Sequence, residues 1–176
     1  MNGFAPYSPG HQPGTATTAE IRAAVSGDIT AMLSVQAGSG RASPTAASFE
    51  AATNDDARLV VVALLDGVLV GWGMTHYFAG GDGTAPAGHY LGGVTVAPSW
   101  RRRGIGAALT QARLDWIWQR ADTAWYVVNP ANRASIALHS RWGFTEVARA
   151  AKFHTTEFTG GVGLLMRARY PQAEQD

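Results

Sequence analysis

Two apolar runs in the middle of the chain have the spacing of a β-hairpin. Leu59–Leu65 is rich in valine and leucine, and Val68–Phe78 continues in the same way after Asp66-Gly67. Apolar and β-branched residues favour strands, and Asp-Gly between two such runs is a strong signal for a two-residue turn. The pattern therefore predicts two antiparallel strands that turn at Asp66 and Gly67.

A helical spacing follows further along, between about residues 104 and 121. Ile105, Leu109, Ala112 and Trp116 recur at i, i+4, i+7 and i+11, which places them along one side of a helix. Gly143 closes a later helical stretch in the way that glycine often does. The remaining predicted segments are strands at 17–25, 89–96, 125–128, 144–154 and 162–170, and helices at 26–36, 44–53 and 132–143.

The first of these helices has two candidate caps, Ser26 and Asp28, and the second starts at Pro44, which a first helical turn tolerates. Gly92 and Gly93 lie inside the strand at 89–96, where glycine suggests a bulge or a close approach by another backbone or by a ligand.

The order of elements predicts a mixed α/β (α+β) fold with one layered architecture. We find no internal repeat. Residues 15–171 are expected to form a single domain, after a disordered leader at 1–14 that holds three prolines and before a short tail at 172–176.

Composition excludes several classes of function. The 176 residues include no cysteine, and the five histidines are scattered without metal-ligand spacing, so we expect no metal site. Fourteen basic and thirteen acidic residues give a net charge of +1, which argues against nucleic-acid or membrane partners. The leader lacks the features of a secretory signal, and we expect a cytoplasmic protein.

The most informative stretch joins the strand at 89–96 to the long helix. It reads Val-Thr-Val-Ala-Pro-Ser-Trp-Arg-Arg-Arg-Gly-Ile-Gly-Ala over residues 94–107. A helix N-terminus with unpaired N–H groups, two glycines and three arginines can bind a pyrophosphate. Neither the P-loop nor the dinucleotide fingerprint matches. The alternative is a solvated arginine run beside a helix start.

This string resembles motif A of the GNAT superfamily of N-acetyltransferases, in which Arg/Gln-x-x-Gly-x-Gly/Ala follows a Val-x-Pro turn. Here the motif is Arg101-x-x-Gly104-x-Gly106, and Asn132 to Phe144 resembles the last-helix block that ends in Gly-Phe. The resemblance covers about residues 17–170. It implies a mostly antiparallel sheet of about seven strands and about four helices, with strands 89–96 and 124–128 splayed to admit acetyl-CoA.

The same resemblance implies a set of residues that bind acetyl-CoA. The backbone of Val94, Thr95 and Val96 would hold the pantetheine arm and the acetyl carbonyl. The pyrophosphate would lie on Arg101, Arg102, Arg103, Gly104, Ile105, Gly106 and Ala107. Asn132 matches a pantetheine contact and shares one helical face with Ser135 and His139. A plain N-cap is the alternative for Asn132.

The catalytic candidates depart from the family pattern. His139 stands where the family commonly has a tyrosine that protonates the leaving thiolate, and a structural histidine is the alternative. The strand at 89–96 has no carboxylate to act as base, which leaves His89, Tyr90 and Glu157 as candidates, each with a surface or packing role as the alternative. An acceptor amine with a low pKa needs no base.

Aromatic residues and Met74 share one face of the strand at 68–78, where they form either a substrate wall or part of the core. That face carries Trp72, Met74, His76 and Phe78.

The leading hypothesis is transfer of the acetyl group of acetyl-CoA directly to a primary amine of a small molecule. Acetylation of a protein N-terminus or lysine is the alternative within enzymes. A non-catalytic acyl-CoA-binding module is the alternative of another class. The oligomeric state stays open, a homodimer included.

Overall fold

The computed structural model describes Phe4, residues 18–40 and residues 44–170, so most of the predicted leader and the tail lie outside the described residues. The elements are those of a mixed α/β fold with four α-helices. In chain order they are β1 (Glu20–Ala23), η1 (Ser26–Asp28), α1 (Ile29–Ala37), α2 (Ala46–Thr53), β2 (Val60–Leu65), β3 (Val68–Phe78), β4 (Gly88–Val96), η2 (Pro98–Trp100), α3 (Ile105–Trp118), β5 (Thr123–Val128), α4 (Arg133–His139), η3 (Ser140–Trp142), β6 (Thr145–Ala150), β7 (Lys152–Phe153), β8 (Thr156–Glu157) and β9 (Gly163–Arg169).

Seven strands form one sheet in the order β1-β2-β3-β4-β5-β9-β6, and β7 and β8 form a separate two-stranded sheet. β4 and β5 run parallel, with His89 opposite Ala124 and Tyr90 opposite Trp125. The pairs β1–β2, β2–β3, β5–β9 and β6–β9 are antiparallel. This confirms the predicted fold class and its mostly antiparallel sheet.

The chain divides into two compact units, and β3, β4 and α3 each contribute residues to both. The first unit contains residues 1–76 and 92–113, and the second contains 77–91 and 114–176.

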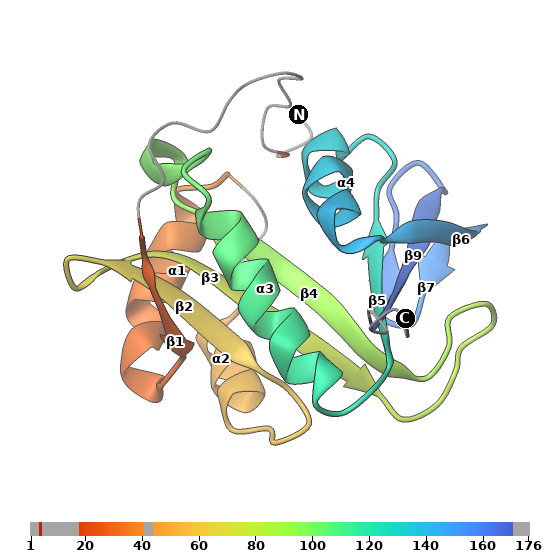
Figure 1. Ribbon diagram of the computed structural model, residues 1–176, viewed down its shortest axis with the longest axis horizontal. Helices are drawn as coiled ribbons and strands as arrows, with labels where there is room; N and C mark the ends of the chain where they lie inside the picture. Colours follow the sequence, from red (N-terminus) through yellow and green to blue (C-terminus); the bar gives the residue numbers. More distant parts are fainter. Residues whose placement is uncertain (1–3, 5–17, 41–43, 171–176) are drawn as a thin grey trace, which may run out of the picture. The chain divides into compact units, whose positions relative to one another are not determined.

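In the first unit, successive residues of β2 point to opposite faces of the sheet, as the pleat requires. Val60 and Val62 pack with Trp72, Met32 and Phe49, the last two from α1 and α2. The alternate β2 residues instead join a second cluster of buried residues, which also contains Ile105 and Leu109 of α3. Figure 1 shows α1 and α2 on one side of β2 and α3 on the other. Both faces of this part of the sheet are therefore covered.

In the second unit, β5 alternates in the same way. Ala124, Tyr126 and Val128 enter one cluster with Phe144 and residues of β9. Trp125 and Val127 pack against another, which contains Tyr90 and Phe153.

The hairpin at Asp66-Gly67 is confirmed. β3 begins at Val68 and ends at Phe78, as predicted, and the two turn residues have φ of +49° and +76°. Positive φ at both central positions is the geometry of a type I′ turn, which asparagine, aspartate and glycine tolerate.

Three details differ from the sequence prediction. Pro44 precedes α2, whose N-cap is Thr45, and the Thr45 hydroxyl accepts a hydrogen bond from the Ser48 N–H. α3 ends at Trp118 and not near residue 121. The single strand predicted at 144–154 is divided into β6 and the β7–β8 hairpin.

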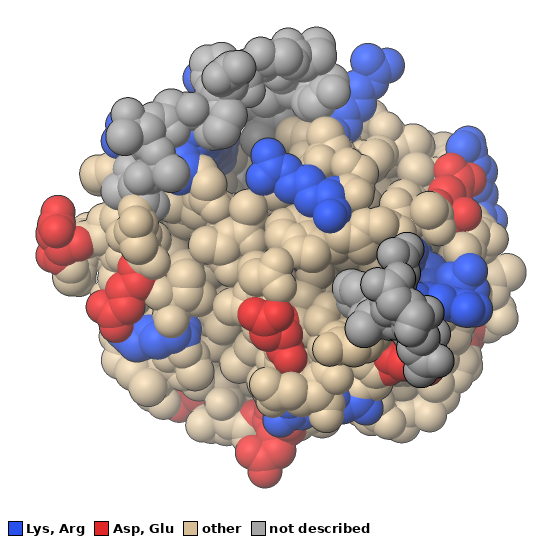
Figure 2. Space-filling model, in the orientation of Figure 1, with Lys and Arg blue, Asp and Glu red and all other residues tan. Residues whose placement is uncertain are grey.

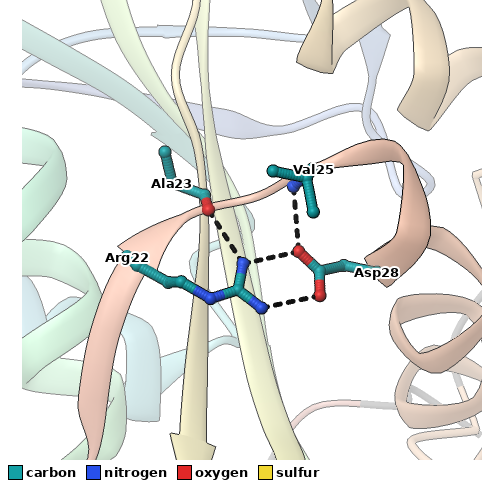
Figure 3. Close-up of polar contacts among 4 residues, drawn as sticks. All are labelled: Arg22, Ala23, Val25 and Asp28. Carbon is teal, nitrogen blue, oxygen red and sulfur yellow. Dashed lines mark hydrogen bonds and ion pairs between the residues drawn. The ribbon is translucent and has the colours of Figure 1, made fainter.

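Asp28 occupies the N-cap position of α1, as predicted, but its side chain forms its hydrogen bonds elsewhere. Its carboxylate makes no hydrogen bond to the first turn of α1. It accepts two hydrogen bonds from Arg22 of β1, at 2.7 and 2.9 Å, and one from the Val25 N–H at 2.8 Å (Figure 3). The hydrogen bonds from Arg22, then that from Val25, hold the pKa of Asp28 below its ordinary value. Asp28 therefore ties β1 to the turn that starts α1.

Gly92 and Gly93 of β4 make room for side chains of β3. A Cβ atom on Gly92 would lie 2.6 Å from Cδ2 and Nε2 of His76, and one on Gly93 would lie 3.1 Å from the Trp72 ring. The His76 ring cannot swing aside freely, because its Nδ1 lies 3.0 Å from the Arg58 guanidinium. The groups that approach these two glycines are thus side chains of β3, where the sequence predicted another backbone or a ligand.

We expect Asp28→Asn to reduce the free energy of unfolding at pH 7 by about 1 kcal/mol, because it removes the charge that three donors surround. The pKa of Asp28 is lowered in the folded protein, so its contribution is present above the unfolded-chain value of roughly 4 and is lost as the pH falls. Urea unfolding should show the two proteins converging near pH 2 to 3. A difference that persists unchanged at that pH would contradict this role.

Gly92→Ala should reduce the free energy of unfolding by about 1–3 kcal/mol, the usual effect of overpacking. The matched control is Gly27→Ala, since a Cβ there meets no atom within 4 Å. A second substitution, His76→Ala, should recover part of the loss in a double-mutant cycle. Equal stability of the Gly92 and Gly27 variants would show that the His76 contact is not limiting.

Candidate functional site

The start of α3, in the first unit, is the candidate anion site. Gly104 has φ of +84°, a region that glycine adopts without strain, and Arg102 has φ of +62°. The first backbone hydrogen bond into the helix is from Ala108 N–H to Gly104 O, at 3.0 Å. Within the described part of the chain, no residue accepts a hydrogen bond from the amide groups of residues 102–107. These N–H groups are available to an anionic ligand.

The three arginines beside these amides have different surroundings. Arg101 is half-buried and its Nε donates to the carbonyl of Val96 at 3.1 Å, which connects the loop to the end of β4. The guanidinium of Arg103 lies 4.8 Å from the centre of the Trp100 ring, a cation–π contact. Arg102 and Arg103 are exposed. Two charges thus remain in solvent next to the open amides.

Charge elsewhere on the visible surface is mixed. On the face drawn in Figure 2, basic and acidic side chains are dispersed among uncharged ones, and no broad field of one sign covers it. None of the described helices is long and apolar enough to span a membrane. The described residues contain no group of three histidine or acidic side chains that could hold a metal ion.

The predicted acyl-arm residues follow β4 into this loop. The hydroxyl of Thr95 is buried and donates to the side-chain oxygen of Gln36 on α1, at 2.7 Å. Val94 and Val96 point to the opposite face and pack against the cluster that contains Leu109. The side chains of all three residues are therefore engaged in packing, and ligand contacts on this stretch fall to the backbone.

Asn132 is the N-cap of α4 in the second unit. Its Oδ1 accepts a hydrogen bond from Ser135 N–H at 3.2 Å. This leaves the two N–H donors of the same side-chain amide, so capping and ligand contact are compatible.

His139 ends α4 in an aromatic environment. Its Nδ1 lies 2.8 Å from the Ser135 carbonyl oxygen, and because a carbonyl only accepts, Nδ1 carries the proton. The imidazole is 3% exposed and stacks on Tyr126, with ring centroids 4.3 Å apart. A neutral His139 thus has its lone pair on Nε2, and it can donate a proton from that atom only after Nε2 is protonated.

Tyr126 is a residue that sequence reasoning missed. It lies on β5, its hydroxyl is buried without a hydrogen-bond partner among the described residues, and burial raises the pKa of its phenol above the ordinary value. The family pattern expects a tyrosine at position 139, and the structure places a phenol from a neighbouring strand against that position. Nothing in the local pattern of β5 distinguishes Tyr126 from a core tyrosine.

The three candidate bases are not equivalent. His89 is buried, and burial followed by the charge of Arg120 lowers the pKa of its imidazole, which keeps the ring neutral at pH 7. Its Nδ1 has no hydrogen-bond partner in the described residues, and the ring packs edge-on against Trp116 at 5.3 Å.

Tyr90 and Glu157 are less suited to accept a proton. The Tyr90 hydroxyl donates to the carbonyl of Pro86 at 2.7 Å, and burial raises its pKa, so the phenol stays protonated. The imidazole of His154 joins this pair, with Nε2 3.1 Å from Pro86 O and 3.2 Å from the Tyr90 oxygen. Glu157 is exposed, and its Oε1 lies 3.8 Å from Nζ of Lys152 in the β7–β8 hairpin.

Arg113 is the second residue that sequence reasoning missed. It is fully buried, and burial lowers the pKa of its guanidinium to about 9, so it is still charged at pH 7. Its Nη1 donates to Met74 O at 3.1 Å and Gly92 O at 3.3 Å, one carbonyl from β3 and one from β4. Its other donors bind Leu109 O and the Thr110 hydroxyl, both at 3.0 Å.

The spacing of buried residues in α3 points to Arg113. The buried stripe of α3 runs through Ile105, Leu109, Arg113 and Ile117 at a spacing of four. The helical spacing in the sequence predicts Ala112 and Trp116 as the continuation instead, and an arginine is seldom fully buried.

Comparison with known proteins agrees with this arrangement. Residues 28–144 match the model of the Acetyltransferase (GNAT) family. A ribosomal protein bS18-alanine N-acetyltransferase of Escherichia coli is 33% identical over 64 residues, which are 36% of this chain and 43% of that protein. The aligned part thus spans less than half the length of that relative.

Solved structures share the fold. The crystal structure of the ribosomal-protein-S18-alanine N-acetyltransferase from Escherichia coli superimposes with a TM-score of 0.71 at 19% identity, over 90% of this chain and 98% of that one. The crystal structure of a GNAT superfamily phosphinothricin acetyltransferase from Sinorhizobium meliloti, in complex with AcCoA, superimposes with a TM-score of 0.69 at 23% identity. The superposition covers 88% of this chain and 89% of that one. With the family model spanning both the anion loop and the last helix, this chain belongs to the Acetyltransferase (GNAT) family.

Proposed function

We propose that this protein transfers the acetyl group of acetyl-CoA directly to a primary amine of a small molecule. The observation that carries the proposal is the set of open amide groups at residues 102–107, at a helix start with two exposed arginines, in a chain of the GNAT family. Direct transfer is the simpler route because the sequence has no cysteine to form an acetyl-cysteine intermediate.

Residues 101–107 would hold the pyrophosphate of the co-substrate. The amides donate hydrogen bonds, the N-terminal end of α3 adds its partial positive charge, and the arginines add full charges. Acetyl-CoA supplies an activated thioester, and what remains for the protein is to orient it, to stabilise the developing oxyanion and to move two protons.

The backbone of Val94 to Val96 is the proposed support for the acyl arm. Thr95 is a backbone contact in this scheme, since its hydroxyl is already bonded to Gln36. Asn132 would reach the pantetheine with its amide N–H groups, and Ser135 would contribute through the same helical face.

Proton delivery to the leaving thiolate is assigned to His139. The hydrogen bond from Nδ1 to Ser135 fixes the ring and directs any acidic proton to Nε2. Tyr126 contacts His139 and offers a neutral phenol, which can donate a hydrogen bond to a thiolate without giving up its proton. For the acceptor amine, His89 is the preferred base, because its neutral ring can take a proton at pH 7.

A protein N-terminus is the second candidate acceptor. The observation in its favour is the similarity to a ribosomal protein bS18-alanine N-acetyltransferase over 64 residues. Release of free thiol from acetyl-CoA with a panel of small amines, compared with a panel of short peptides, separates the two. If acetyl-CoA binds but neither panel releases free thiol faster than hydrolysis does, the protein would be a non-catalytic acyl-CoA-binding module.

Gly106→Leu should weaken acetyl-CoA binding by more than about 10-fold, because a bulky side chain in the proposed phosphate loop would hinder the approach of a ligand to the backbone amides. Gly27→Leu is the control for the general effect of adding a side chain at a helix start. Isothermal titration calorimetry measures both, with the melting temperature as a check on folding. Affinity within twofold of wild type would contradict the phosphate-loop assignment.

His139→Tyr should retain or increase turnover if position 139 delivers the proton, because it restores the residue common in the family. Tyr126→Phe tests the neighbouring phenol and should lower kcat by less than about 10-fold, the effect of a single neutral hydrogen bond. Thiol release under saturating acetyl-CoA is the measurement. A large loss of kcat in His139→Tyr with normal folding would assign His139 to substrate contact or structure.

A further inference from the structure

Two guanidinium groups act on the imidazole of His76 in the first unit. Arg58 Nη2 lies 3.0 Å from His76 Nδ1. Burial, then the charge of Arg58 and then that of Arg113, lowers the pKa of His76 to about 4. Within the described residues neither arginine forms an ion pair with a carboxylate. Two guanidinium groups are therefore close to His76, and neither has a carboxylate of the described residues at ion-pair distance.

Arg113 cannot meet a ligand, because it is fully buried and its donors are directed at backbone carbonyls and Thr110. Arg58 is different. It is half-buried, and its Nε donates to Thr75 O at 3.2 Å while Nη2 faces His76 Nδ1 and, at 3.6 Å, the sulfur of Met74. No described residue accepts a hydrogen bond from Arg58 Nη1. That nitrogen retains two donors for a partner from solution.

The orientation of His76 follows from the same contact. A guanidinium only donates, so His76 Nδ1 accepts and the neutral ring carries its proton on Nε2. Nε2 and Cδ2 lie against the bare Cα of Gly92. The His76 ring thus lies against β4 at Gly92, two residues before Val94, where the acyl arm is proposed to lie, and Arg58 contacts the opposite edge of that ring.

We propose that Arg58 binds a carboxylate of the acceptor, so that the substrate class is amino acids rather than simple amines or peptides acetylated at a remote amine. This inference rests on the proposed acetyl transfer. Guanidinium is the side chain best matched to a carboxylate, through paired charge-assisted hydrogen bonds.

Phosphate groups of the co-substrate are the other source of a negative charge. They are assigned to residues 101–107, beyond the opposite end of β4. Gly92 and Val96 are four residues apart on an extended strand, roughly 13 Å. A carboxylate on the acceptor is therefore the ligand that the position of Arg58 favours.

A binding test needs no turnover. N-acetylglycine, a product of the proposed class, and N-methylacetamide, its neutral counterpart, are titrated into the full chain and followed by NMR. We expect N-acetylglycine to bind about 10- to 100-fold more tightly, and Arg58→Gln to remove that difference. Arg58→Lys should keep part of the difference in affinity between the two probes. Arg141→Gln, which removes an exposed arginine in η3, should keep the whole difference. Equal binding of the two probes, or no effect of Arg58→Gln, would overturn the inference.

A kinetic test measures which amines accept the acetyl group. Glycine, β-alanine and 4-aminobutyrate are compared with alkylamines of the same chain length, as acceptors for acetyl-CoA. Arg58→Gln should raise the KM of the best amino acid about 10- to 100-fold and leave its kcat, the KM of acetyl-CoA and the rates with alkylamines within twofold. Failure of acetyl-CoA to bind would overturn the proposed function instead. A rise in the KM of acetyl-CoA alone would assign Arg58 to the phosphates and overturn this inference.

Discussion

A charge buried in the first unit constrains the arrangement of its strands. The guanidinium of Arg113 has no carboxylate partner in the described part of the chain, so its desolvation is offset only by hydrogen bonds. It obtains them from the backbone of α3 itself and from one carbonyl each of β3 and β4. The helix that begins with the anion loop is thereby fastened to the strand proposed to carry the acyl arm. The geometry of both depends on that one side chain.

The same cluster explains why β4 has glycine where β3 has large side chains. His76 and Trp72 fill the space that side chains of Gly92 and Gly93 would take. Arg58 holds the His76 ring in place from the other side. A packing constraint, a fixed tautomer and a guanidinium group meet at one place on the strand. In the second unit, His139 has a comparable fixed orientation, set by the Ser135 carbonyl and the Tyr126 ring.

Local patterns predicted much of this fold. The Asp66-Gly67 turn needs only two residues with positive φ, and the Gly143 end of the last helix is equally local. The predictions that failed depended on which nearby groups pair with one another, and residue composition does not show that pairing. Asp28 forms hydrogen bonds with Arg22 and Val25 instead of capping α1, because a bidentate arginine is a stronger partner than a helix N–H group. The strand predicted at 144–154 is interrupted by a separate hairpin, although its composition is continuous.

In the candidate site, too, the sequence predicted the local features and missed those that depend on the folded chain. The glycines and arginines at 101–107 and the last-helix block identify the family from sequence, because a phosphate-binding helix start is a local structure. Arg113, Tyr126 and the Arg58–His76 pair are scattered between residues 58 and 126, and each looks like an ordinary charged or core residue in its own segment. The sequence by itself determined the Asp66-Gly67 hairpin and the glycine- and arginine-rich start of α3, since neighbouring residues create them. Only the tertiary structure decided which charges are buried, which tautomers are fixed and where positive charge accumulates, because burial and partnership are properties of the folded chain.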